Sequence, residues 1–192
     1  MLSFTTFGTK IYISFSFTVC ITLLAILDKS GLLFVSFIAV FFHELGHYIA
    51  LKLCGIKAVD ISFILASVKL NIHQQITDKT TVIIAFCGPA FNLLLSGFIL
   101  TDNYYIKYFG VANFILFMFN MLPVSNLDGG DILKYIVCTI FKKSGNKIFC
   151  VISKITICLF IAPIGVFFML KFKNPTILLV GIYIFIMSYR KV

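Results

Sequence analysis

Long apolar stretches, separated by short segments that carry lysine, constrain this 192-residue chain more than any other feature. Hydrophobic residues make up 60% of it and charged residues 12%, against about 45–50% and about 25% in a soluble domain. A helix needs about 20 apolar residues to cross a bilayer, and stretches of this length recur. We therefore expect an all-α polytopic membrane protein. Six spans are predicted, at about 11–27, 31–53, 81–100, 106–122, 148–170 and 175–189.

The basic residues predict which way these spans run, because lysine and arginine accumulate in cytoplasmic loops. On one side of the predicted membrane lie Lys10, Lys52, Lys57, Lys69, Lys79, Lys134, Lys142, Lys143, Lys147, Arg190 and Lys191. On the other side lie Lys29, Lys107, Lys171 and Lys173, while Lys154 is counted on neither. We therefore expect a multi-pass integral membrane protein with both termini in the cytoplasm. The net charge of +9 comes from loop lysines that meet anionic lipid headgroups, so no nucleic-acid partner is expected.

The segment between the second and third spans has the pattern of strands. Apolar residues alternate with others through 59–73, as they do in a half-buried strand. The alternation changes register near Ala66, which predicts a hairpin or a bulge. We expect a short membrane-associated β-hairpin here.

The second span contains His43-Glu44-Leu45-Gly46-His47, which fits the pattern H-E-x-x-H. Histidines four residues apart lie on one face of a helix, so both imidazoles can reach one tetrahedral zinc ion. The adjacent glutamate can take a proton from zinc-bound water, whose pKa the metal lowers to about 7. The pattern therefore predicts metal-assisted hydrolysis, with Glu44 as general base and then as proton donor to the leaving amine.

The setting of this motif makes a chance match a poor explanation. Glu44 is the only glutamate of the chain, and His43 and His47 are two of its three histidines. An ionisable residue within a span costs roughly 2.5–3.5 kcal/mol on insertion, and such residues usually have a function. A buried polar network that joins helices is the structural alternative. We prefer the metal site.

A catalytic zinc site usually has a third protein ligand and one position for water. His73 and Asp60 belong to the predicted hairpin region, whereas Asp128 and Asp131 follow the fourth span on the same predicted side as the histidines. The spacing leaves this choice open.

The segment before these aspartates, from Asn120, contains Pro123 and continues into Gly129-Gly130. Proline ends a helix and glycine permits unusual backbone conformations. Such a segment is typical both of irregular backbone that lines a cavity within a membrane and of an ordinary loop after a helix.

H-E-L-G-H, followed by N-x-x-P-x-x-x-L-D-G-G at 120–130 and by G-P-x-x-N at 88–92 in the third span, resembles the site-2 protease family of intramembrane zinc metalloproteases. The resemblance covers residues 31–133. It implies one zinc ion per chain, held by His43, His47 and Asp128. It also implies that Glu44 is the catalytic base and that Asn120 helps to hold the substrate or the transition state.

Within this family the six-span plan resembles the stage IV sporulation protein FB group. This resemblance implies cleavage of a membrane-tethered substrate, such as a pro-sigma factor or an anti-sigma factor, and a role in sporulation. We expect a single transmembrane protease domain over 1–192 without PDZ or CBS domains, a site toward the cytoplasmic side, and the bilayer and a membrane regulatory protein as further partners. A divalent-metal transporter and an inactive membrane scaffold are the alternative functions.

Overall fold

A computed structural model describes residues 2–6, 9–28, 30–56, 59–64, 67–72 and 77–172. The chain divides into two compact units, residues 1–117 and 118–192, which are described in turn. The predicted sixth span, 175–189, lies outside the described residues.

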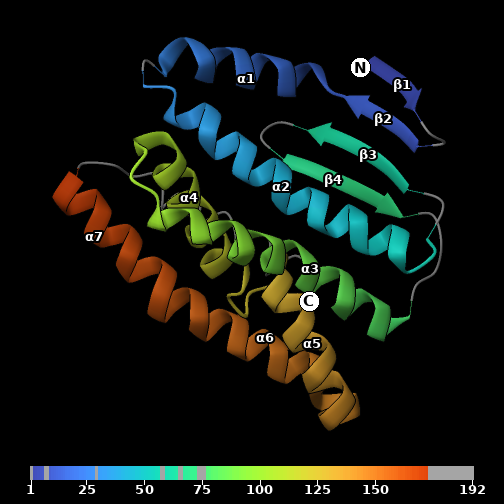
Figure 1. The fold of residues 1–192 in the computed structure, drawn as a ribbon. Helices are drawn as coiled ribbons and strands as arrows, with labels where there is room; N and C mark the ends of the chain where they lie inside the picture. The colour runs from blue at the N-terminus through green and yellow to red at the C-terminus, as the bar shows by residue number, and fades with distance from the viewer. Residues whose placement is uncertain are drawn as a thin grey trace. The chain divides into compact units, whose positions relative to one another are not determined.

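The first unit contains a four-stranded sheet in the order β1-β2-β3-β4 (Figure 1). Its strands are β1 Leu2–Thr6, β2 Thr9–Ile13, β3 Val59–Ile64 and β4 Ser67–Ile72. The β1–β2 and β3–β4 pairs are antiparallel, and β2 and β3 are joined in parallel with Ile11 opposite Ile61. Strands β3 and β4 occupy the segment for which a hairpin is expected, while its association with the membrane stays a prediction.

The N-terminal strands correct the predicted first span, which is wrong at its start. Residues 9–13 belong to β2, and the helix that follows, α1, is Phe15–Leu27. The prediction of an all-α fold with a single hairpin is therefore incomplete, because residues 2–13 contain two further strands. The boundary lies at Ser14, whose Oγ accepts the Phe17 N–H at 3.2 Å, and a single serine within an otherwise apolar stretch is a weak signal for the start of a helix.

Helices α2 Leu32–Leu53 and α3 Asp78–Leu95 pack against each other in the first unit (Figure 1). A 3-10 helix, η1 Ser96–Leu100, extends α3, and α4 is Tyr104–Asn120. The side chain of Thr77 caps α3 by accepting the Thr80 N–H at 3.3 Å, which satisfies one of the N–H groups that a helix start leaves open.

Helices α5 Asp128–Phe141 and α6 Gly145–Thr156 pack together in the second unit, joined by the 3-10 helix η2 Lys142–Ser144. A π-helical turn, η3 Ile157–Ile161, continues into α7 Ala162–Phe172. Helix α5 lies where only a loop was expected between the fourth and fifth spans. The π turn directly precedes Pro163, where a kink is expected, and a bend there stays a prediction.

Three stretches among the described residues are long and apolar enough to cross a membrane: Leu32–Leu53, Asp78–Leu100 and Asp128–Phe167. The first two agree with the predicted second and third spans, and the last contains most of the predicted fifth. The total of six spans stays a prediction.

Candidate metal centre

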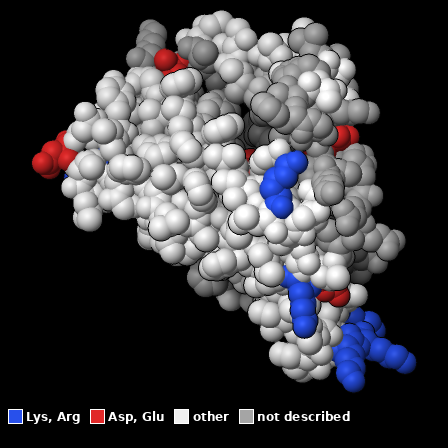
Figure 2. Space-filling view, turned by 45° about the vertical axis from the view of Figure 1, so that its right-hand side comes forward, with Lys and Arg blue, Asp and Glu red and all other residues white. Residues whose placement is uncertain are grey.

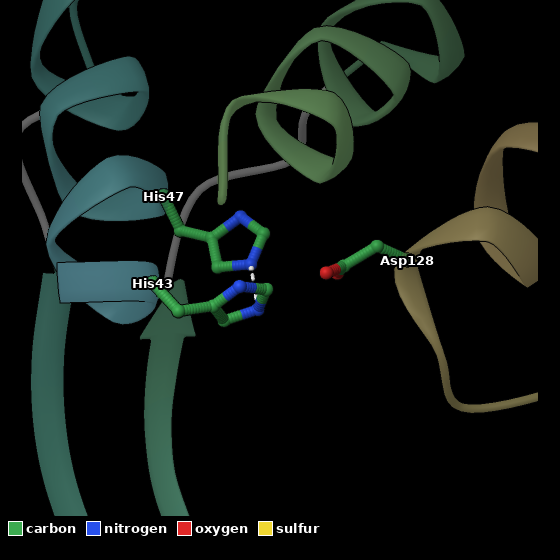
Figure 3. A group of neighbouring side chains, drawn as sticks. All are labelled: His43, His47 and Asp128. Carbon is green, nitrogen blue, oxygen red and sulfur yellow. Dashed lines mark hydrogen bonds between the residues drawn. The ribbon is translucent and has the colours of Figure 1, made fainter. Parts of the chain in front are cut away.

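His43 and His47 lie one helical turn apart on α2 and are both buried. Their Nε2 atoms are 3.1 Å apart, and Figure 3 shows the two rings turned toward each other at these atoms. Two nitrogen ligands at about 2.0–2.1 Å from a tetrahedral zinc ion lie about 3.3 Å from each other. The pair therefore has the spacing of two ligands to one ion.

The main chain of α3 orients His47. Its Nδ1 lies 2.8 Å from the carbonyl oxygen of Ile84. A carbonyl oxygen can only accept a hydrogen bond, so Nδ1 carries the proton and donates it. The neutral ring then has its lone pair on Nε2, which is the atom nearest His43, and a second hydrogen bond of this kind is typical of metal-binding histidines.

Glycines at the contact of α2 with α3 make room for these rings. A Cβ atom at Gly88 would overlap the imidazole of His47, and one at Gly46 would lie 2.8 Å from the carbonyl oxygen of Cys87. Small residues let two helices approach closely within a membrane. The first part of the G-P-x-x-N pattern thus has a local physical reason in this chain.

The asparagine of that pattern, Asn92, contacts His43. Asn92 is completely buried, and its side-chain amide lies 3.2 Å from Nδ1 of His43. Ile84, Gly88 and Asn92 are spaced by four residues, so they lie along one face of α3. The sequence alone indicated the G-P-x-x-N pattern only through the family resemblance. The contact of Asn92 with His43 depends on the packing of α2 against α3.

Glu44 directly follows His43 on α2 and is half-buried. Successive residues on a helix point about 100° apart, so Glu44 does not share the face on which the two histidines lie. Glu44 is therefore next to the histidine pair in the chain but is not a third member of the same row.

Asp128 is the first residue of α5 and is half-buried. Cβ atoms at Gly129 and Gly130 would overlap the main-chain carbonyl groups of Met121 and Val124. The two glycines therefore allow the backbone to approach closely at the start of α5. The residue of this segment with a positive φ is Asn126, at 73°. Asp128 belongs to the second unit and the two histidines to the first, and Figure 3 draws all three side chains.

Asp131 is exposed and lines an open cavity of about 550 Å³ together with Lys134, Lys147 and Lys154. Asn120 is the last residue of α4 and is half-buried. Asp60 lies on β3, and His73 is outside the described residues.

Comparison with known proteins identifies the class to which the chain belongs. Residues 31–105 and 103–163 match Peptidase family M50, so the chain is a member of this family. The family implies zinc as the metal for the group in Figure 3.

Two individual proteins show similarity as well. A protein of Synechocystis sp. named "Putative zinc metalloprotease sll0528" is 32% identical over 127 residues, which cover 60% of this chain and 32% of that protein. This chain thus spans about a third of the length of that relative. The solved structure of the site-2 protease from Methanocaldococcus jannaschii has a TM-score of 0.65 at 22% identity, covering 98% of this chain and 94% of that one, which shows a shared fold.

Proposed function

We propose that the protein is a zinc-dependent intramembrane endopeptidase that hydrolyses a peptide bond of a membrane-tethered protein. The observation that carries the proposal is the pair of buried histidines whose Nε2 atoms converge at 3.1 Å, on a helix apolar enough to cross a membrane. The sole glutamate of the chain stands beside them.

His43 and His47 hold the zinc ion through Nε2, and Asp128 is the third ligand. Two imidazoles and a carboxylate form a donor set that zinc accepts in catalytic sites. The position of Asp128 in the L-D-G-G motif supports this assignment. When bound, zinc supplies Lewis acidity and lowers the pKa of a bound water to about 7.

Glu44 moves the protons of the reaction. Its carboxylate takes a proton from the attacking water and then gives that proton to the nitrogen of the leaving amine, so that one carboxyl group serves both steps. A half-buried carboxylate next to a ligand residue is placed for this purpose. Asn120 holds the substrate or the transition state through its side-chain amide.

The sheet provides a place for the substrate. A helix hides its peptide bonds in internal hydrogen bonds, so a membrane-spanning substrate has to unwind before it can be cut. Strand β4 ends the sheet order β1-β2-β3-β4 and offers an edge to which an extended segment can add by main-chain hydrogen bonds. We propose this edge as the docking strand.

The finer assignments rest on the motif resemblance and the lysine distribution. They are a pro-sigma or anti-sigma factor as substrate, a role in sporulation, cytoplasmic termini, and a site toward the cytoplasm with a membrane protein as regulator. A divalent-metal transporter and an inactive scaffold remain the alternatives that an experiment has to exclude.

Zinc content per chain in purified wild-type protein, Asp128→Ala and Asp131→Ala tests the ligand set. We expect about one zinc in the wild type and in Asp131→Ala, and clear loss in Asp128→Ala, because a catalytic zinc site has three protein ligands. Unchanged zinc in Asp128→Ala would refute this ligand, and a wild type that takes up no supplied zinc would refute the protease.

Glu44→Gln separates the function classes. A protease with this mechanism keeps its zinc and loses cleavage of a membrane-tethered substrate by about 10²–10⁴-fold, the usual contribution of general acid–base catalysis. Zinc transport by reconstituted wild-type protein, with no cleavage by either form, would favour the transporter. A Glu44→Gln variant that cleaves as well as the wild type would overturn the proposed mechanism.

A further inference from the structure

Asn92 is buried inside the α2–α3 contact but belongs to none of the roles assigned above. It is completely inaccessible to solvent, and a polar side chain is rarely buried in this way without a hydrogen-bonding purpose. Its Nδ2 atom lies 3.2 Å from Nδ1 of His43. Its Oδ1 atom has no hydrogen-bond partner within the part of the chain that the structure describes.

The two ends of this amide differ in what they do to His43. If Nδ2 donates to Nδ1, the neutral imidazole has its proton on Nε2, and that nitrogen cannot bind a metal. If the amide is turned by 180°, Oδ1 accepts a proton from Nδ1, and the lone pair of the ring is on Nε2. The oxygen and nitrogen of an amide have nearly the same shape, so their assignment follows from the hydrogen bonds they make.

Zinc binding favours the turned amide. When His43 and His47 both bind one ion through Nε2, neither Nε2 carries a proton, so the proton of the neutral His43 ring is on Nδ1 and the amide atom beside it has to accept it. His47 has the same arrangement, because its Nδ1 donates to the carbonyl oxygen of Ile84. Either orientation leaves one end of the amide without a described partner, so the choice is decided at His43.

We propose that Asn92 is a positioning residue, which accepts the Nδ1–H of His43 on Oδ1 and thereby holds the metal-binding Nε2 in its deprotonated form. This inference rests on the proposed zinc site and adds to it a residue on a second helix. Helix α3 then controls both histidines, His47 through a main-chain carbonyl and His43 through a side chain. The two hydrogen bonds run in opposite order along α2 and α3, as expected for antiparallel helices.

The zinc affinity of Asn92→Asp and Asn92→Leu tests this role, measured by competition with a chelator in detergent solution. A carboxylate can accept but not donate, so Asn92→Asp should bind zinc within about threefold of the wild type or more tightly, as in carboxylate–histidine–zinc arrangements. Asn92→Leu should weaken zinc binding by about 10–100-fold, the usual effect of losing such a partner.

Asn113→Leu is the matched control. Asn113 is also completely buried, its Nδ2 donates to the carbonyl oxygen of Phe109 at 2.8 Å, and its Oδ1 also has no partner among the described residues. Its replacement should leave the zinc affinity unchanged. A similar loss in Asn113→Leu and Asn92→Leu would show a general effect of removing a buried amide and would overturn the proposal.

Other outcomes are equally decisive. If Asn92→Asp loses zinc as strongly as Asn92→Leu, Asn92 donates to His43 and the proposal about Asn92 is wrong. Zinc binding by the wild type would in that case still support the proposed protease function. A wild type without zinc refutes both. Should Asn92→Leu fail to fold, the ¹⁵N chemical shifts of His43 in the wild type and Asn92→Asp still decide, because they report directly whether Nδ1 or Nε2 carries the proton.

Discussion

The α2–α3 pair and the α5–α6 pair differ in the charge of their exteriors. The first pair buries polar residues, His43, His47 and Asn92, and exposes large apolar ones such as Phe86 and Leu94. The second pair buries the apolar Val137 and Phe149 together with the polar Ser153 and Thr156. Its exterior carries the exposed lysines Lys134, Lys142, Lys143 and Lys147. In Figure 2 basic side chains gather at the lower end of the view, while most of the visible face is uncharged.

This difference indicates the surroundings of each pair. An apolar exterior around a polar interior suits a helix pair in lipid, where a polar group has to find its partners within the protein. An exterior that carries several lysines suits water or the headgroup region at the place where those lysines lie. The paired histidines therefore belong to the pair whose exterior is adapted to hydrocarbon.

The largest expected effect tests this contrast directly. Phe86 on α3 and Phe141 at the end of α5 are each 51% exposed, so they form a matched pair for replacement by lysine. Phe86→Lys should make membrane insertion less favourable by roughly 2.5–3.5 kcal/mol, whereas Phe141→Lys, next to Lys142, should cost less than about 1 kcal/mol. The fraction of protein that resists alkaline extraction from membranes measures both, and equal losses would contradict the contrast.

A second prediction concerns the space that the polar interior of α2–α3 requires. Gly88→Ala adds a methyl group that overlaps the ring of His47, so zinc affinity should fall at least tenfold, in line with an overpacking cost of about 1–3 kcal/mol. Gly97→Ala is the control, since no atom lies within 4 Å of a Cβ at that position. Chelator competition measures both variants, and an unaffected Gly88→Ala would show that the two helices separate easily.

Buried polar contacts in the second unit should affect stability alone. Ser153 is completely buried, and its Oγ accepts the N–H of Ser125 at 3.0 Å. Ser153→Ala should lower the free energy of unfolding by about 1–3 kcal/mol, the cost of leaving a buried group unsatisfied, with zinc still near one per chain. Denaturant titration beside exposed Ser144→Ala measures this effect, and loss of zinc would show that the contact also supports the metal site.

The smallest effect is expected at the start of α2. The hydroxyl of Ser30 donates to Asp28 at 2.6 Å, and the N–H of Leu33 donates to it at 2.7 Å. These hydrogen bonds, with that of Ser30 foremost, lower the pKa of Asp28. The stabilisation they give is present above the ordinary pKa of 3.8 and is lost as the pH falls through the lowered value. Thermal unfolding between pH 5 and 2 should therefore depend slightly less on pH in Asp28→Asn.

The sequence predicts some of these elements well because their signals are local. An apolar stretch of helical length with histidines four apart predicts a helix over 31–53, and α2 is Leu32–Leu53. The role of Asn92 could not be predicted in this way. Its partner His43 is 49 residues away, so the contact exists only through the packing of α3 on α2. Strands of five residues such as β2 are equally hard to recognise beside an apolar helix.

The parallel pairing of β2 with β3 limits how many times the chain between these strands can cross the membrane. Both strands belong to one sheet, so if that sheet lies on one side of the bilayer, the chain between them crosses it an even number of times. If α2 crosses, α1 has to cross too, as it is the other described helix between these strands. Its 13 residues reach only about 20 Å, against a hydrocarbon thickness of about 30 Å. A helix this short that crosses would be matched by a locally thinner bilayer, which would shorten the distance that water must travel to the buried histidines.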